Sequence, residues 1–123
     1  MLLITTRRTG RWNIPKGNVA AGFSLPASAE KEAFEEAGIR GRISENAAAI
    51  YRTIKRLKDR QLILDVVVYL LLVDAEEENW PEIGQRQKRW VSAAEAATLL
   101  QEPSLSNLCL SLAASHSVER QQS

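Results

Sequence analysis

Three glutamates that fall within one helical turn form the cluster with the clearest chemical potential in this sequence. Glu32, Glu35 and Glu36 would lie within an arc of roughly 100° on a helix. Such close carboxylates repel one another, and the last turn of a helix disfavours negative charge. A hard divalent cation would relieve both effects, because Mg²⁺ prefers oxygen ligands and shares them with phosphate groups. The alternative is a solvated acidic face with a surface pair between Lys31 and Glu35.

The segment that carries these glutamates has the start and stop signals of a helix. Residues 26–37 are predicted to be helical, since Pro26 suits a first turn and Gly38 suits the residue after the last turn. Residues 9–22 contain three glycines and a proline, so we expect a loop around a short extended piece at 12–14. The glutamate cluster would therefore sit on one rigid helical turn that follows this loop.

The rest of the chain shows patterns of strands and helices without a regular alternation. We expect strands at residues 2–6, 47–55, 62–73 and 86–91, a basic hairpin turn at 55–60, an acidic loop at 74–84, helices at 92–100 and from Pro103 to about Ala114, and a frayed polar tail at 115–123. Ser92 and Glu95 have the spacing of a capping box. Three consecutive valines at 66–68 favour a central strand that is buried on both faces. This mixture predicts an α+β fold, or a mixed sheet flanked by helices.

Composition points to one globular domain. The chain has 123 residues, of which 45 % are hydrophobic and 25 % are charged, so residues 1–123 can form a core without disulfides or a structural metal. The formal net charge of +1 gives no argument for binding nucleic acid or membranes. Cys109 is the single cysteine, which excludes an internal disulfide, and its leucine-rich surroundings favour a buried thiol. Because a membrane-spanning apolar run and a signal-peptide layout are both lacking, a reducing, cytoplasmic setting is expected.

The glutamate-bearing segment resembles the signature of the Nudix family, G-x5-E-x7-R-E-U-x-E-E-x-G-U, in which U is an apolar residue. The matching residues are Gly17, Glu32, Glu35, Glu36, Gly38 and Ile39. Phe23 stands where the signature has its first glutamate, and Lys31 stands where it has arginine. In the family those two positions are thought to brace the loop against the helix, while the later glutamates chiefly hold the metal.

Further segments are similar to the diphosphoinositol polyphosphate and diadenosine polyphosphate hydrolase branch of that family. They are Thr5-Thr6-Arg7, the run Arg11-Trp12-Asn13-Ile14-Pro15-Lys16-Gly17, and Trp80 ahead of the run Arg86-Gln87-Lys88-Arg89-Trp90-Val91. Members of this type usually carry one more strand, with basic residues, before the stretch that matches residues 2–7. The resemblance implies a single Nudix domain over residues 1–123, in which this strand is either absent or belongs to a longer chain that starts earlier. The missing strand would leave an exposed sheet edge, which a second copy in a homodimer could cover.

By this resemblance, the fold is a mixed β-sheet sandwiched between α-helices, and roles can be assigned to the site residues. Glu32 and Glu36 would be the main metal ligands, and the carbonyl of Gly17 a further one. Glu35 would be a third ligand or the general base for the attacking water. The cation would be Mg²⁺ or Mn²⁺, which lowers the pKa of a bound water and neutralises phosphate oxygens. The expected phosphate-binding residues are Arg7, Arg86, Lys16 and Arg11, each with an ordinary surface residue as the alternative.

The activity implied by the resemblance is Mg²⁺-dependent hydrolysis of a phosphoanhydride bond in a nucleoside- or inositol-linked polyphosphate, by attack of water at phosphorus. A nucleoside triphosphate or a triphosphorylated RNA 5′ end is the alternative substrate. A different class of function is a catalytically silent Nudix domain that binds a nucleotide or polyphosphate as a sensor, which Phe23, Lys31 and the short N-terminus favour. The expected partner is a phosphorylated small molecule, with no membrane and with nucleic acid only as an RNA 5′ end.

Overall fold

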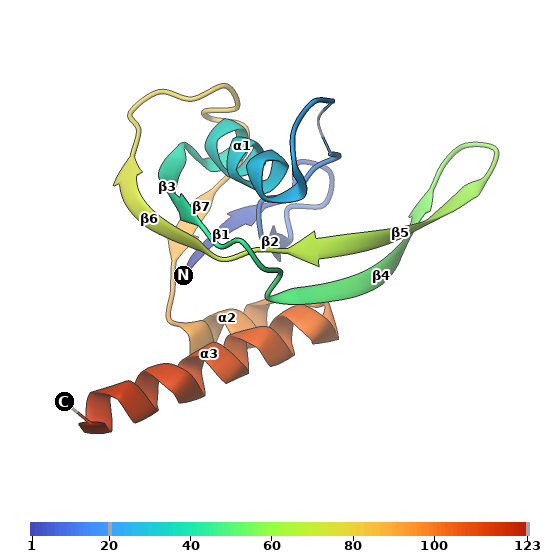
Figure 1. The fold of residues 1–123 in the computed structure, drawn as a ribbon. Coiled ribbons are helices and arrows are strands. Elements are labelled where there is room, and N and C mark those ends of the chain that lie inside the picture. The colour runs from blue at the N-terminus through green and yellow to red at the C-terminus, as the bar shows by residue number, and fades with distance from the viewer. Residues whose placement is uncertain (20, 123) are drawn as a thin grey trace.

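The computed structural model describes the backbone of residues 1–19 and 21–122, and the side chains of these residues as far as residue 115. The strands are β1 (Leu2–Thr5), β2 (Trp12–Asn13), β3 (Ile39–Ile43), β4 (Ala49–Arg56), β5 (Gln61–Val68), β6 (Leu71–Glu76) and β7 (Lys88–Trp90), and the helices are α1 (Leu25–Ala37), α2 (Ala93–Leu99) and α3 (Pro103–Gln122). The strands form a layer with α1 on one side and with α2 and α3 on the other (Figure 1). The predicted α+β class and the α/β/α layering are therefore confirmed. Within the described residues, no helix is long and apolar enough to cross a membrane.

The strand layer is divided into three antiparallel groups. Among the described strands, these groups are β2–β1–β7, β3–β6 and β4–β5. The segment predicted as one strand at 62–73 forms two, because β5 ends at Val68 and pairs with β4, whereas β6 begins at Leu71 and pairs with β3. The expectation of a central strand at 66–68 is wrong, since β5 pairs with no described strand other than β4.

Strand β3 was not predicted from the sequence. Its residues alternate between apolar and charged around Gly41, and an interior glycine weakens the strand signal. The pairing of β3 with β6 has a register shift between Arg40 and Gly41, which is a β-bulge. A Cβ atom on Gly41 would collide with the backbone carbonyl of Leu72. The glycine that hides the strand in the sequence is therefore the residue that lets the two strands approach.

The hydrophobic core has two parts, and β1 contributes to both. Leu3 packs in the cluster that includes Leu105 and Cys109 of α3, whereas Leu2 packs in the cluster that includes Ala33 of α1. Successive side chains of a strand point to opposite faces, so β1 is buried between the two helix layers. The thiol of Cys109 is buried and free, as predicted. β1 therefore joins the two parts of the core.

Local capping fixes both ends of α1. Ser24 is the N-cap, and its Oγ accepts the backbone N–H of Ala27 at 3.2 Å. Gly38 ends the helix with a left-handed φ of 68°, and its N–H donates to the carbonyl of Phe34 at 2.8 Å. The predicted helix at 26–37 is therefore confirmed to within one residue.

The two C-terminal helices begin where the sequence predicts. Ser92 caps α2, since its Oγ accepts the N–H of Glu95 at 3.1 Å. α3 begins at Pro103 but continues to Gln122, past the predicted end near Ala114. The tail predicted to fray is thus helical through residue 122, and residue 123 lies outside the described residues.

Candidate active site

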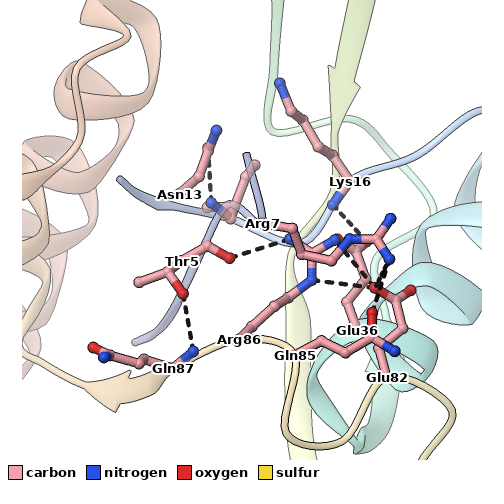
Figure 2. A network of polar contacts seen from close by, with 10 residues as sticks. Thr5, Arg7, Asn13, Lys16, Glu36, Glu82, Gln85, Arg86 and Gln87 are labelled. Atoms are coloured by element: carbon pink, nitrogen blue, oxygen red, sulfur yellow. Dashed lines mark hydrogen bonds and ion pairs between the residues drawn. The ribbon is translucent and has the colours of Figure 1, made fainter. Parts of the chain in front are cut away.

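Glu36 is the buried centre of the candidate site. Its side chain is only 4 % exposed, and each of its carboxylate oxygens has a partner from another segment. Oε1 lies 3.0 Å from Nη2 of Arg86, and Oε2 accepts the backbone N–H of Lys16 at 3.1 Å (Figure 2). Burial raises the pKa of Glu36 to about 7, although the charge of Arg86 opposes this shift. The nearby carboxylates of Glu32 and Glu82 raise it further.

Glu32 brings its carboxyl group to both Glu36 and the glycine-containing loop. A hydrogen bond between the side chains of Glu32 and Glu36 contributes to the raised pKa of Glu36. The carboxyl group of Glu32 also lies against Gly17, where an added Cβ atom would be only 2.6 Å from Oε1. Glycine at this position therefore lets the loop backbone approach a carboxylate. The three residues expected to hold the metal most directly, Glu32, Glu36 and Gly17, lie together.

Glu35 faces a different partner on the same helix. Nζ of Lys31 donates a hydrogen bond to Oε1 of Glu35, and this bond raises the pKa of Lys31. The surface pair weighed from the sequence is thus present. Phe23, the other residue that departs from the signature, has an exposed side chain. The loop is instead tied to α1 by the hydrogen bond from the N–H of Lys16 to Glu36 and by the close approach of Gly17 to Glu32.

A carboxylate that was not predicted reaches the site from the loop between β6 and β7. The N–H of Glu82 donates to the carbonyl of Glu35 at 3.0 Å, so this loop caps the C-terminal turn of α1. Oε1 of Glu82 then lies 3.2 Å from Nη2 of Arg86 and 3.7 Å from Nη1 of Arg7. One signal in the sequence could have indicated that Glu82 pairs with Arg86. Glu82 precedes Arg86 by four residues, a spacing at which opposite charges often pair.

The predicted phosphate-binding residues lie in different parts of the structure. These residues are Arg7, Lys16, Arg86 and Arg11. Arg7 is exposed and donates to Oε1 of Gln85 at 2.8 Å, and the side chain of Lys16 extends away from Glu36 (Figure 2). Arg86 is almost buried among protein oxygens. Arg11 donates to Oε1 of Gln101 at 3.1 Å, in a small pocket of about 190 Å³ beside the junction of α2 and α3. The fold therefore gathers three of these residues near the glutamates and places Arg11 elsewhere.

The donors at this site suit a hard divalent cation in their chemistry. The carboxylates of Glu32 and Glu36 meet beside the backbone of Gly17, and Mg²⁺ favours such an all-oxygen set. Among the described residues, however, no group of three or more His, Cys, Asp or Glu side chains is arranged to hold a metal. Glu35 is instead paired with Lys31.

A cleft of about 1120 Å³ adjoins these donors. Gly17 and Glu32 form part of its wall, and most of its other lining residues are apolar and come from both helix layers and from β5. Lys16, Lys55 and Arg56 add positive charge to the lining. The cleft therefore offers space for a substrate group next to the carboxylates, with cations that attract anions.

The sequence matches a known family over most of its length. The NUDIX domain model covers residues 1–108, a range that includes α1, the preceding loop and the loop that carries Glu82 and Arg86. The chain therefore belongs to the Nudix family, as the fold and the spacing of the glutamates indicate.

Similar proteins include members of this family from a plant and an animal. Nudix hydrolase 4 from Arabidopsis thaliana is 35 % identical over 101 residues, which cover 82 % of this chain and 47 % of that protein. Nudix hydrolase 21, chloroplastic, from the same plant is 35 % identical over 102 residues, covering 82 % and 50 %. Diphosphoinositol polyphosphate phosphohydrolase 3-beta from Bos taurus is 28 % identical over 104 residues, covering 82 % and 59 %. The chain thus spans about half the length of the curated relatives it matches.

Proposed function

We propose that this chain is a hydrolase that depends on Mg²⁺ or Mn²⁺ and cleaves a phosphoanhydride bond in a nucleoside- or inositol-linked polyphosphate. The observation that carries this proposal is the meeting of Glu32 and Glu36 beside Gly17, on the helix that the family signature specifies. Membership of the Nudix family supports the reaction class. The similarity to a protein named as a diphosphoinositol polyphosphate phosphohydrolase supports the substrate class.

Each site residue has a role in this proposal. Glu32 and Glu36 would hold the cation with the carbonyl of Gly17. When bound, the cation supplies charge that acidifies a water and offsets the charge of the phosphate oxygens. Glu35 would accept the proton of the attacking water, because it lies on the same helical turn as both ligands. Arg7 would bind a phosphate, since its side chain is 58 % exposed beside Glu82.

Two weaker assignments and the alternative functions complete the proposal. Lys16 would contact an outer phosphate from the lining of the cleft, whereas a phosphate role for Arg11 stays a prediction. A nucleoside triphosphate or an RNA 5′ end is the second substrate class. A silent polyphosphate sensor is favoured by one specific observation, the pair between Lys31 and Glu35, because it engages the group that would act as general base.

The proposal also covers the number of domains, the oligomeric state and the location of the protein. We propose that residues 1–123 form one domain, because β1 joins both parts of the core. A homodimer and a cytoplasmic location stay predictions. The relatives include proteins named as chloroplastic and mitochondrial, so the location needs its own measurement.

The first experiment measures phosphate release from diadenosine polyphosphates, inositol pyrophosphates and nucleoside triphosphates, with and without Mg²⁺. We expect metal-dependent release from at least one of them. Glu35→Gln should reduce kcat by about 100-fold or more, because it removes a general base. Glu30→Gln is the matched control, since Glu30 is exposed on α1, and it should leave the rate unchanged. Binding of these compounds without turnover, in a chain shown to be folded, would favour the sensor and exclude the hydrolase.

A further inference from the structure

Arg86 contacts protein oxygens with all three of its guanidinium nitrogens. Nε and Nη2 lie 3.3 Å and 3.2 Å from Oε1 of Glu82, and Nη2 also lies 3.0 Å from Oε1 of Glu36. Nη1 donates to the carbonyl of Thr5 at 3.2 Å (Figure 2). The side chain is only 12 % exposed. One residue thus joins the end of β1, the last turn of α1 and the loop before β7.

We propose that Arg86 is a positioning residue, which fixes the carboxylates of Glu36 and Glu82 relative to β1, and that it does not bind the substrate phosphates. The inference rests on the proposed hydrolase, whose cation ligand Glu36 it would hold in place. Oε1 of Glu36 is held by Arg86, and Oε2 is held by the N–H of Lys16, so the carboxylate is restrained from both sides.

The contacts of Arg86 argue against a move towards a phosphate. Such a move would leave the buried carboxylate of Glu36 without its partner, which is strongly unfavourable in a protein interior. Arg7 offers a contrast, because its side chain is 58 % exposed, and its Nη1 donates a hydrogen bond to Gln85 and lies 3.7 Å from Oε1 of Glu82. Arg7 can therefore change partners at little cost, and Arg86 cannot.

The two residues that depart from the family signature support a positioning role for Arg86. The two positions thought to brace loop and helix are occupied by Phe23, which is exposed, and Lys31, which pairs with Glu35. Within the described part of the chain, neither side chain forms a hydrogen bond or ion pair between the loop and α1. The planar fork of Arg86 reaches two carboxylates and a carbonyl at once, which the single ammonium group of lysine could not do. Arg86 therefore supplies a brace from a different part of the chain.

The test combines steady-state kinetics with calorimetric titration of Mg²⁺ into the substrate-free protein at pH 8.5. The variants are Arg86→Gln, Arg86→Lys and, for comparison, Arg7→Gln. Arg89→Gln is the control, since Arg89 forms an exposed pair with Glu95, and it should change neither readout. For both Arg86 variants we expect kcat to fall by about 10- to 100-fold while KM stays within about twofold, because misplaced ligands slow the chemistry rather than substrate binding.

The Mg²⁺ titration distinguishes a positioning role of Arg86 from direct contact with a substrate phosphate. Because Arg86 holds the proposed metal ligand Glu36 at 3.0 Å, Arg86→Gln should weaken Mg²⁺ binding by about threefold or more, and unchanged or tighter binding would overturn the positioning role. Arg7→Gln should instead raise KM and leave Mg²⁺ binding unchanged. A raised KM with unchanged kcat and unchanged Mg²⁺ affinity in Arg86→Gln would overturn the proposal. So would full recovery of activity by Arg86→Lys, since lysine serves well as a point charge for phosphate.

Two further outcomes remain decisive. If near-ultraviolet circular dichroism shows that Arg86→Gln does not fold, Arg86→Lys keeps the charge and is judged by the same criteria. If no substrate is hydrolysed by the wild type, the proposed function fails, but the Mg²⁺ titration still decides whether Arg86 acts on the carboxylates. An unchanged Mg²⁺ affinity would then overturn the positioning role by itself.

Discussion

At the scale of single residues, the partner of each carboxylate decides its chemistry. Glu36 is buried between Arg86 and the N–H of Lys16, and its pKa is raised to about 7. Glu35, on the same helical turn, is bound to the more exposed Lys31. Glu32 lies between these two environments and against Gly17. One repeated residue type thus gives three carboxylates with different surroundings, which is consistent with the proposed division between metal ligands and a general base.

A substitution at Gly17 should act directly on Glu32. The Cβ atom of Gly17→Ala would lie 2.6 Å from Oε1 of Glu32, so the carboxylate must move away. We expect Mg²⁺ affinity to fall by about tenfold or more, because displacing a metal ligand or its support has effects of this size. Isothermal titration calorimetry measures it. Gly10→Ala is the control, since its left-handed φ of 69° makes alanine unfavourable but nothing lies near its Cβ. Equal losses in both variants would contradict a specific effect on Glu32.

At the scale of elements, α1 is held at its C-terminal end by the loop that follows β6. The N–H of Glu77 donates to the carbonyl of Gly38 at 2.7 Å, and the N–H of Glu82 donates to that of Glu35 at 3.0 Å. These bonds satisfy helix carbonyls that otherwise lack partners. Trp80 of the same loop packs on Gly38. The position of Glu82 in the site therefore depends on how the loop covers the helix end.

Two glycines with a similar positive φ distinguish the effect of packing against Trp80 from the effect of backbone strain. Gly38 and Gly84 have φ values of 68° and 81°, but an added Cβ atom lies 2.5 Å from Cε3 of Trp80 at Gly38 and meets nothing at Gly84. Gly84→Ala should lower the free energy of unfolding by about 1 kcal/mol. Gly38→Ala should lower it by about 1–3 kcal/mol more, because it also overpacks the contact with Trp80. Urea denaturation measures both, and equal losses would mean that Trp80 does not restrain the helix end.

At the scale of the whole molecule, β4 and β5 form a ribbon that extends away from the three-layered body (Figure 1). The side chains of Ile50, Ile54 and Ile63 are exposed on it, and Ile54 pairs directly with Ile63. These three isoleucines project from the same face, because paired positions and alternate residues share a face. An exposed apolar face on a strand that lacks a second neighbour favours association with another chain.

This face should make the protein associate with itself. We expect the mean mass measured by light scattering after size-exclusion chromatography to rise above 13.7 kDa as the protein concentration increases. The double variant Ile54→Thr with Ile63→Thr should remain nearer the monomer mass, since threonine keeps the strand preference without the apolar surface. Its melting temperature should change little, because both side chains are exposed. A wild type that is monomeric at every concentration would contradict the expected dimer.

The sequence by itself determined the features that depend on near neighbours along the chain. The spacing of the three glutamates, the proline and glycine signals at the ends of α1, and the Ser92 cap all involve residues a few positions apart. Helix geometry converts such spacings into faces and ends with little influence from the rest of the fold. Gly17 could also be identified from the sequence, because the family signature is itself a pattern of fixed spacings.

Only the tertiary structure decided which groups surround those glutamates. The N–H of Lys16 reaches Glu36 across 20 residues of sequence, and Arg86 reaches the carbonyl of Thr5 across 81. The pairing of β3 with β6, the entry of Glu82 and the placement of Arg11 beside Gln101 are likewise long-range contacts. Burial and the partners of a charge depend on how distant segments pack, and no local spacing encodes that packing. The sequence could therefore identify the carboxylates, whereas the fold assigned Arg86 to hold them.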